Sequence, residues 1–561
     1  MKRSLPMARW IAGAVIAAVV VAAVPFAAES KSAPPKVESA LLAAARANPN
    51  AVFPVIVRGA TTAAALKKNG KDSAERTRKA QDALARSTGD KRSLGVIGGA
   101  SASLRGSEIL ALTTDARVDR IIADQRFSVS WSTADAALAA STAGILAVNA
   151  PLAWARTGAT GNGIGIAVLD SGVADHVDLA GRVTARVDFT GDGLSGDPGG
   201  HGTHVAGLIA GDGTASGGAF TGVAPRASIV SVRVIDATGH ASLSRIFAGM
   251  QWILQYRRAY NIRVVNMSFG APAQSSYMQD LLASASELLN FAGITVVVAA
   301  GNSGPGQSTV TTPGTDPFVI TVGADDDGAT PGLLDDAIAS WSSQGPTAFD
   351  GIAKPDLVAP GRKMVSLRAA GSAIDQAYPD RRVTAPGALE AKYFTMSGTS
   401  MAAPVVAGVV ALLLERSGNA TPRQIKRQLM ATAHPLRGVT PTLQGSGVVD
   451  ALAALTTPAA WAPYTGYPVS TAFADQIEPY LYGQPITWRD PSFHGGVDSR
   501  GIPWGDITWE TITWDDITWE DITWEAFSWQ DVTWEDITWE DITWETTSAP
   551  LGGSGGWTLV N

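Results

Sequence analysis

The sequence predicts an α/β fold with a doubly wound, mostly parallel sheet that carries helices on both faces. Two observations predict it. Between about residues 145 and 456, short runs rich in Val and Ile alternate with longer stretches that suit helices. The runs are almost continuously apolar rather than alternating, which is typical of parallel strands covered on both faces. In such sheets the functional groups gather where strands end.

The predicted elements alternate along this region. Strands are expected at residues 164–170, 227–235, 262–269, 294–300 and 318–324. Helices are expected at residues 242–260, 277–293 and 400–414. Polar and reactive side chains interrupt the apolar pattern at only a few strand and helix ends, and those ends are the first candidates for a functional site.

Composition excludes several classes of protein. A chain of 561 residues is long enough for two to four domains. The absence of cysteine excludes a disulfide scaffold, thiolate metal sites and a cysteine nucleophile. A net charge of -8 argues against nucleic acid as a partner, while 45% hydrophobic and 17% charged residues are ordinary for a globular protein.

Residues 1–28 have the layout of a secretory signal peptide. Basic residues Lys2, Arg3 and Arg9 precede an apolar run that begins at Trp10 and ends before Pro25, and small residues follow. The run is shorter than the roughly 20 residues of a bilayer span, so a cleaved signal is favoured over an uncleaved anchor. We expect a secreted, extracellular protein, with association with the cell envelope as the alternative.

Charge divides the chain into a basic front and an acidic end. Residues 31–130 hold 17 Lys and Arg against 9 Asp and Glu, whereas residues 505–545 hold 13 Asp and Glu and no Lys or Arg. Residues 131–504 carry a balance of -5. A basic segment before an acidic body could dock on that body, or it could be an independent basic domain.

Three reactive residues stand at predicted element ends. Asp170 follows the apolar run IGIAVL, His201 lies in GHGTHVAG, and Ser400 begins the helix in SGTSMAAPVV. Considered singly, each has an ordinary explanation. Asp170 could be a turn or helix-cap residue, His201 could be half of a His-x-x-His metal pair, and Ser400 could be a helix N-cap. Considered as a set, an acid, an imidazole and a serine at a helix start are the parts that make a hydroxyl nucleophilic. Asn302, in a glycine-flanked turn after another buried strand, could donate to the oxyanion of acyl transfer.

The segments VLDSGV, GHGTHVAG, AAGNSG and GTSMAAP, which carry Asp170, His201, Asn302 and Ser400, resemble the signatures of the subtilisin-like serine proteases in the same chain order. The resemblance extends from about residue 145 to residue 455. It implies a subtilisin-like fold in which Ser400 is the nucleophile, His201 the general base and then acid, and Asp170 its orienting partner. Asn302 and the Ser400 backbone N–H would form the oxyanion hole, and His204 would be structural.

The resemblance implies a serine endopeptidase that hydrolyses polypeptides through an acyl-enzyme, with no cofactor required for the chemistry. The alternative is a catalytically silent scaffold on the same fold that presents the C-terminal tail. Residues 35–128 resemble the small α+β prosegment of these proteases, which acts as an intramolecular inhibitor and folding chaperone. Residues 129–144 would then be a cleavable linker, and residues 145–456 the catalytic domain of an autoprocessed zymogen.

The same resemblance implies the edges of the substrate pocket and one metal position. The edges are expected from small or backbone-rich positions, namely Ser268, Phe269, Gly270, Ala300 and Gly301. Thr311 stands where many relatives have glycine, which favours a shallow pocket for medium-sized apolar P1 residues. Asp178 resembles a calcium-ligand position, so structural calcium is expected there, with a solvated loop Asp as the alternative.

A tryptophan repeat follows the predicted linker at residues 457–503. From Trp504 to Trp544 tryptophan recurs every five residues, in units such as DITWE, before a final tail at residues 546–561. The repeat at residues 504–545 could be a β-solenoid or β-ribbon, an acidic disordered spacer that orders on a partner, or an aromatic platform for polysaccharide. We expect it to bind partners on the cell surface or other copies of the chain.

Overall fold

The computed structural model describes residues 36–60, 72–85, 87, 91–129, 144–458, 467 and 469–470. The predicted signal peptide at residues 1–28, the tryptophan repeat at residues 504–545 and the tail at residues 546–561 lie outside the described residues. All of the predicted linker at residues 129–144 except its two end residues also lies outside them.

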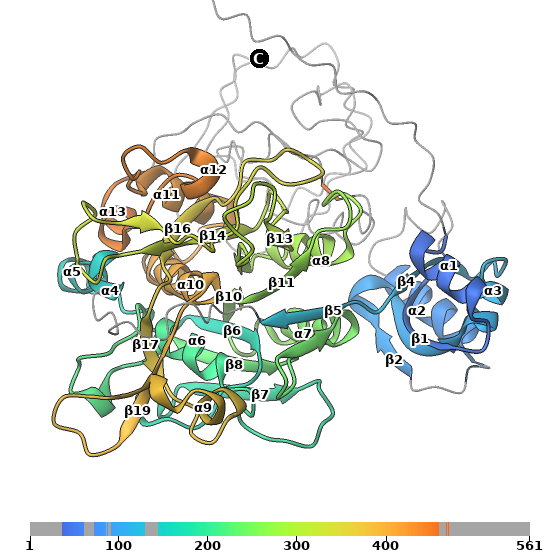
Figure 1. The fold of residues 1–561 in the computed structure, drawn as a ribbon, viewed down its shortest axis with the longest axis horizontal. Helices are drawn as coiled ribbons and strands as arrows, with labels where there is room; N and C mark the ends of the chain where they lie inside the picture. The colour runs from blue at the N-terminus through green and yellow to red at the C-terminus, as the bar shows by residue number, and fades with distance from the viewer. Residues whose placement is uncertain are drawn as a thin grey trace, which may run out of the picture.

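The main sheet has eight strands among the described residues, and it is mostly parallel, as predicted (Figure 1). Their order is β15-β14-β12-β10-β6-β8-β7, with β16 also paired to β14. Only β15 pairs in the antiparallel sense. The strands are β6 Gly165–Asp170, β7 Val183–Asp188, β8 Ser228–Arg233, β10 Ile262–Met267, β12 Thr295–Ala299, β14 Ile320–Asp326, β15 Ala337–Ile338 and β16 Leu357–Pro360.

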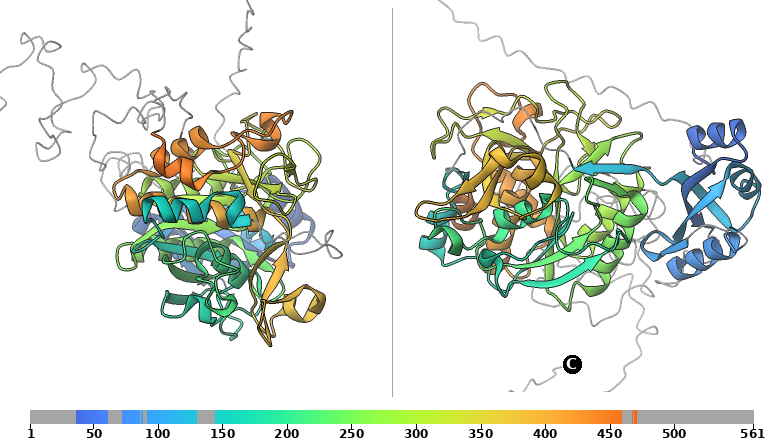
Figure 2. Two further views of the ribbon diagram at one scale, coloured as in Figure 1. Left: turned by 90° about the vertical axis from the view of Figure 1, so that its left-hand side faces the viewer. Right: turned by 60° about the horizontal axis from the view of Figure 1, so that its bottom comes forward.

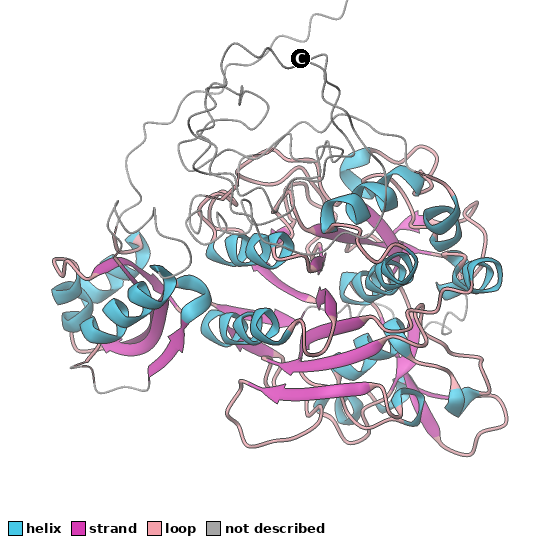
Figure 3. Cartoon of the chain, turned by 180° about the vertical axis from the view of Figure 1, so that it is seen from behind, coloured by secondary structure: helices cyan, strands magenta, loops and turns pink. Residues whose placement is uncertain are grey.

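Helices cover both faces of this sheet, which explains why its strands are apolar throughout (Figure 3). Alternate residues of β6 enter different cores. Ile166 and Val168 pack in a cluster with α6 (His201–Ala210) and α10 (Thr399–Arg416), while Ala167 and Leu169 pack in a cluster with α7 (Leu243–Tyr256) and α8 (Leu281–Phe291). Since successive side chains of a strand point to opposite faces, the two clusters are the two sides of one sheet.

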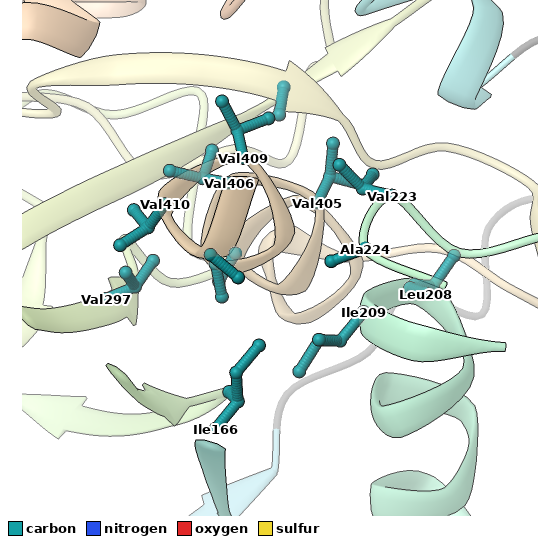
Figure 4. Packing of buried hydrophobic residues seen from close by; sticks show 14 of the residues in the cluster. Ile166, Leu208, Ile209, Val223, Ala224, Val297, Val405, Val406, Val409 and Val410 are labelled. Carbon is teal, nitrogen blue, oxygen red and sulfur yellow. The ribbon is translucent and has the colours of Figure 1, made fainter. Parts of the chain in front are cut away.

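Helix α10 is the central helix of the first core. Its Val410 points toward Val297 of β12, and on another side Val405 lies beside Val223 (Figure 4). Among the described residues it is the one helix long and apolar enough to cross a membrane, yet 89% of it is buried in the protein. A helix that is apolar all round is expected in such a core.

The N-terminal part of the described chain forms an α+β module with a core of its own, while Leu94, Val96 and Ile97 belong to the core that contains α7. Its antiparallel sheet has the order β2-β3-β1-β4. The module contains β1 Val52–Gly59, β2 Lys91–Leu94, β3 Gly99–Arg105, β4 Val118–Ala123, α1 Ser39–Ala47, α2 Asp72–Ala83 and α3 Gly106–Leu112.

One strand runs from this module into the large domain (Figure 2, right). It is β5 (Arg126–Val129), which lies between β9 (His240–Ser242) and β11 (Phe269–Pro272) and pairs with both in the antiparallel sense. Next to β11 lies β13 (Thr311–Thr312), so the order of this second sheet is β13-β11-β5-β9. The chain therefore places its own extended segment between two strands of the large domain.

The remaining elements surround these layers. A three-stranded antiparallel sheet, in the order β17-β19-β18, packs beside α6. The elements are α4 Gly144–Ala147, α5 Ala150–Thr157, β17 Met364–Leu367, α9 Ala373–Ala377, β18 Arg382–Thr384, β19 Ala391–Met396, α11 Pro422–Thr432, α12 Pro441–Gln444 and α13 Ala451–Thr456.

Part of the predicted linker at residues 457–503 is packed on the large domain. Val469 is buried in the core that contains α8, and the backbone N–H of Ser470 donates to the carboxylate of Glu287 on that helix. Burial of Glu287, next to the negative charge of Asp316, raises its pKa well above the usual value. Residues 469–470, within the predicted linker, are therefore held on the large domain by buried contacts.

Candidate active site

Three neighbouring strands end at one edge of the main sheet, at the place where the sequence predicted functional residues. Strands β12, β10 and β6 lie side by side. Asp170 is the last residue of β6, Ser268 follows β10, and Asn302 lies three residues after β12. The carboxyl ends of adjacent parallel strands face the same side, so the fold brings these distant segments together.

The predicted acid and base are in contact. Nδ1 of His201 lies 2.8 Å from Oδ1 and 3.0 Å from Oδ2 of Asp170. Both side chains are buried, and Oδ1 of Asp170 also accepts the backbone N–H of Ser171 at 2.7 Å. Since an ionised carboxylate only accepts, Nδ1 of His201 carries the hydrogen and Nε2 is left as an acceptor.

A carboxylate that the sequence did not single out holds the segment before His201. Asp197 is buried and accepts from Ser171 Oγ at 2.8 Å, Gly200 N at 2.7 Å, Thr203 N at 2.7 Å and Thr203 Oγ1 at 2.6 Å. Burial raises its pKa, and the four donors oppose that rise. An Asp four residues before a candidate base, in a glycine-rich loop, was the available signal for this positioning role.

The second histidine of the motif is structural, as the resemblance implied. Nε2 of His204 lies 3.1 Å from the backbone oxygens of both Met364 and Phe394, which belong to β17 and β19. Burial, with the charge of His201 as the next cause, lowers the pKa of His204 to about 3. A neutral imidazole therefore joins α6 to the small sheet.

The predicted nucleophile lies at the start of α10 and contacts the end of β10. Ser400 is the second residue of the helix and is buried. Its hydroxyl donates to the backbone oxygen of Ser268 at 2.9 Å, and the Ser268 hydroxyl donates to the backbone oxygen of Ser400 at 2.9 Å. His201 Nε2 has no hydrogen-bond partner within the described part of the chain. The acid–base contact is thus formed, whereas the base and the serine are not hydrogen-bonded in this state.

The side chain of Asn302 is oriented by Thr399, a residue that the sequence did not identify. Oδ1 of Asn302 accepts both the backbone N–H and the hydroxyl of Thr399 at 2.9 Å. A backbone N–H can only donate, so this contact identifies the amide oxygen and leaves the Nδ2 hydrogens for another acceptor. The Thr399 hydroxyl also accepts the backbone N–H of Gly301 at 3.1 Å.

The predicted pocket-edge residues lie around Thr311. A β-carbon on Gly270 would lie 2.3 Å from Oγ1 of Thr311, and one on Gly301 would lie 2.8 Å from its Cγ2. The backbone N–H of Thr311 donates to the oxygen of Ala300 at 2.9 Å. Thr311 therefore lies between the two backbone segments predicted as the pocket walls. Only glycine at positions 270 and 301 leaves room for the Thr311 side chain.

The predicted wall residue Phe269 faces the core rather than the groove between the glycines. It is buried, and its ring meets that of Phe127 of β5 edge to face at a centroid distance of 6.4 Å. This aromatic pair accompanies the main-chain pairing of β5 with β11. The contact between an N-terminal strand and this wall could not be read from the sequence, because the two segments are 142 residues apart.

Calcium does not fit at Asp178. Its side chain is buried, Oδ2 accepts the Tyr393 hydroxyl at 2.6 Å, and Oδ1 accepts the backbone N–H of Ala215 at 2.7 Å. The guanidinium of Arg182 donates to the backbone oxygens of Asp178 and Ala210, so it already provides positive charge there. The expectation of a calcium ligand is wrong at this position, as is the alternative of a solvated Asp. In the part of the chain that the structure describes, no three His, Asp or Glu side chains form a metal-binding group.

Comparison with known proteins gives one consistent result. Residues 161–456, a little over half of the chain, match the model of the subtilase family. The chain is 40% identical over 298 residues to serine protease AprX of Bacillus subtilis (strain 168), covering 52% of this chain and 66% of the relative. It is 35% identical over 312 residues to subtilisin Savinase of Lederbergia lenta, covering 55% of this chain and 97% of the relative.

A solved structure shows the same likeness. Fervidolysin from Fervidobacterium pennivorans, described as a keratinolytic enzyme related to subtilisin, matches with a TM-score of 0.55 and 26% identity. The match covers 74% of this chain and 63% of fervidolysin. The chain therefore spans slightly less than two thirds of both fervidolysin and the AprX protease.

Proposed function

The chain belongs to the subtilase family of serine endopeptidases, and we propose that it hydrolyses polypeptides with Ser400 as nucleophile, His201 as general base and Asp170 as the acceptor that orients His201. The observation that carries this proposal is β5, an extended segment of polypeptide paired on both sides between β9 and β11. A peptide substrate would add to the same two strands by main-chain hydrogen bonds.

The geometry supports an acyl-transfer sequence. The Ser400 hydroxyl, now directed at Ser268, would rotate to donate to His201 Nε2, which has the lone pair to take the proton. The Ser400 oxygen would attack the substrate carbonyl carbon, and His201 would then give the proton to the leaving amine. Water would hydrolyse the acyl-enzyme by the same steps, with water in place of the serine.

Charge on the substrate oxygen would be stabilised by two donors. One is the Nδ2 group of Asn302, whose orientation is held by Thr399, and the other is the backbone N–H of Ser400. Ser400 also lies in the first turn of α10, an 18-residue helix whose N-terminal end carries partial positive charge. All three contributions act where negative charge develops, and so they favour the transition state over the bound substrate.

We propose further that the N-terminal module is an inhibitory prodomain of a secreted zymogen. Its basic charge suits the acidic body, and β5 occupies the path that a substrate would take. Val129, the last residue of β5, pairs with Phe269, and the residue before Phe269 is Ser268, which Ser400 contacts. We therefore expect self-cleavage between Ser130 and Trp131.

A fluorophosphonate probe tests the function directly. We expect covalent labelling of Ser400 in the processed protein, because the probe reacts with a serine only when a base and an oxyanion hole activate it. Peptide mapping by mass spectrometry would locate the label. Processed protein without label on Ser400 would support the alternative, a catalytically silent scaffold that presents the C-terminal tail.

The position of Thr311 leads to a prediction about substrate choice. Replacing Thr311 with glycine should deepen the pocket between Gly270 and Gly301 and raise kcat/KM for substrates with Phe or Tyr at P1 relative to those with Ala or Val. The change should be about 10-fold or more, since one or two buried methyl groups are worth roughly 1–3 kcal/mol in such a pocket.

A pair of peptide substrates that differ only at P1 would measure the ratio. Ser308→Gly is a suitable control, because it removes another hydroxyl side chain three positions earlier, where the residue is exposed. An unchanged ratio in Thr311→Gly would contradict the proposed role of Thr311 as the pocket floor.

A further inference from the structure

A second group of carboxylates lies away from the candidate active site, where β14 and β15 meet. Five acidic residues occur within twelve positions of the chain: Asp325, Asp326, Asp327, Asp335 and Asp336. The function proposed above uses none of them. Three have protein donors: Asp326 pairs with Arg362, Asp327 accepts the backbone N–H of Ala329 at 3.0 Å, and Asp335 accepts the Thr330 hydroxyl at 2.8 Å.

The strand register explains why Asp325 and Asp336 meet. Asp325 of β14 pairs with Ile338 of β15, and Asp326 pairs with Ala337. Asp336 precedes Ile338 by two residues, so its side chain lies on the same face of the sheet as that of Asp325 and diagonally opposite it. The two carboxyl groups therefore face each other because of the hairpin geometry.

These two side chains have no protein donor. All four carboxylate oxygens are buried, and none accepts from an N–H or a hydroxyl group of the described residues; the two carboxyl groups lie within hydrogen-bonding reach of each other only. The Asp325 side chain is fully buried, with 0% exposure. Buried carboxylates are almost always paired or hydrogen-bonded, so this pair lacks a partner that its environment requires.

A shared proton would satisfy this pair only in part. One proton forms a single O–H···O contact between two of the four oxygens and leaves the other two without a donor. It also removes one negative charge from a group of five carboxylates that includes Asp326, Asp327 and Asp335. A divalent cation with its bound water can contact carboxylate oxygens of both residues and neutralises two charges.

We propose that Asp325 and Asp336 bind a hard divalent cation, Ca²⁺, at the junction of β14 and β15. Carboxylate oxygens are ligands of choice for Ca²⁺, and because no third carboxylate completes the set here, water and main-chain oxygens would supply the other ligands. This position is distinct from Asp178, where Arg182 provides the positive charge.

The site is joined to the start of α10 by two main-chain hydrogen bonds. The backbone oxygen of Asp325 accepts the N–H of Gly361 at 2.9 Å, and the oxygen of Gly361 accepts the N–H of Gly398 at 2.8 Å. Gly398 is the N-cap of α10, two residues before Ser400. A cation that holds the end of β14 would therefore stabilise the loop on which Ser400 depends, and its loss should lower the temperature of unfolding.

Thermal unfolding of the full chain carrying Ser400→Ala tests the proposal without interference from self-digestion. We expect 10 mM CaCl₂ to raise Tm over that in EDTA by about 5 to 10 °C, the shift for a ligand at a hundredfold excess over a Kd of about 10⁻⁴ M. Asp336→Asn in the same background should lose most of this shift. Asp335→Asn is the matched control, since it removes one charge at the next residue, and it should keep the shift.

Equilibrium dialysis with radioactive Ca²⁺ gives an independent count of the ions bound per protein molecule. The Ser400→Ala protein and its Asp335→Asn variant should each bind one more Ca²⁺ ion than the Asp336→Asn and Asp325→Asn variants. Two ligand variants are used so that the result stands if one of them folds poorly. Equal binding by all four proteins would overturn the proposal. A Tm that rises in Asp325→Asn without Ca²⁺, with no response to Ca²⁺ in any protein, would also overturn it and indicate a shared proton.

Discussion

Replacing Ser400 with alanine is expected to lower kcat for peptide hydrolysis by about 10⁶-fold and to leave the N-terminal module attached to the large domain. Without the hydroxyl, neither the buried Asp170–His201 pair nor the oxyanion donors has a nucleophile to activate. The residual rate would come from the oxyanion hole and substrate binding alone. Hydrolysis of a chromogenic peptide and N-terminal sequencing of the secreted protein measure the two effects.

Ser417→Ala is the matched control for this substitution. Ser417 is the C-cap of the same helix and is exposed, so its replacement should preserve both hydrolysis and processing. Wild-type protein should begin at Trp131, as the register of β5 predicts. If Ser400→Ala protein produced alone also begins at Trp131, self-cleavage is wrong and another protease removes the module.

Replacing Asn302 with alanine is expected to lower kcat by roughly 10² to 10³ while changing KM little. The amide oxygen of Asn302 is held by both donor groups of Thr399, so its NH₂ group is oriented before substrate binds. This donor would gain strength as the carbonyl oxygen becomes an oxyanion, and its loss should affect the transition state more than the substrate complex. The Ser400 backbone N–H remains as the second donor, which limits the loss.

Steady-state kinetics of Asn302→Ala and Ser303→Ala would separate this role from general disturbance of the loop. Ser303 is the next residue and is exposed, so its variant should keep the wild-type kcat. A rise in KM at constant kcat in Asn302→Ala would mean that the side chain binds substrate and transition state equally, which would contradict its assignment to the oxyanion hole.

Local sequence patterns were sufficient to predict the architecture of the large domain. Runs such as those containing Ile166 and Val297 are apolar at every position because both faces of their strands are buried, and this predicted a parallel sheet before its order was known. The same pattern indicated Asp170, His201 and Ser400 as candidates, since a reactive side chain at the end of an apolar element contrasts with its neighbours. In the structure Asp170 contacts His201, and the hydroxyl of Ser400 donates to the backbone oxygen of Ser268.

Residues that act through other residues were not identifiable in this way. Asp197 and Thr399 look like ordinary loop and helix-start residues, and their roles appear only in their contacts with the backbone around His201 and with Asn302. For Asp178 the error is the opposite one, since the sequence indicated a role that the contacts of the side chain do not support. Its motif resembled a calcium position, but whether an Asp binds an ion depends on its other neighbours, and here Tyr393 and Arg182 take that place.

The amino-acid sequence by itself therefore determined the fold class and the candidate reactive groups, because apolar periodicity and residue type are local properties of the chain. Only the tertiary structure decided which strand pairs with β11, which carboxylates have donors, and which pair, Asp325 and Asp336, has none. These are properties of register and burial. They arise when segments more than a hundred residues apart pack together, or when a hairpin selects one face of a strand, and no single segment contains that information.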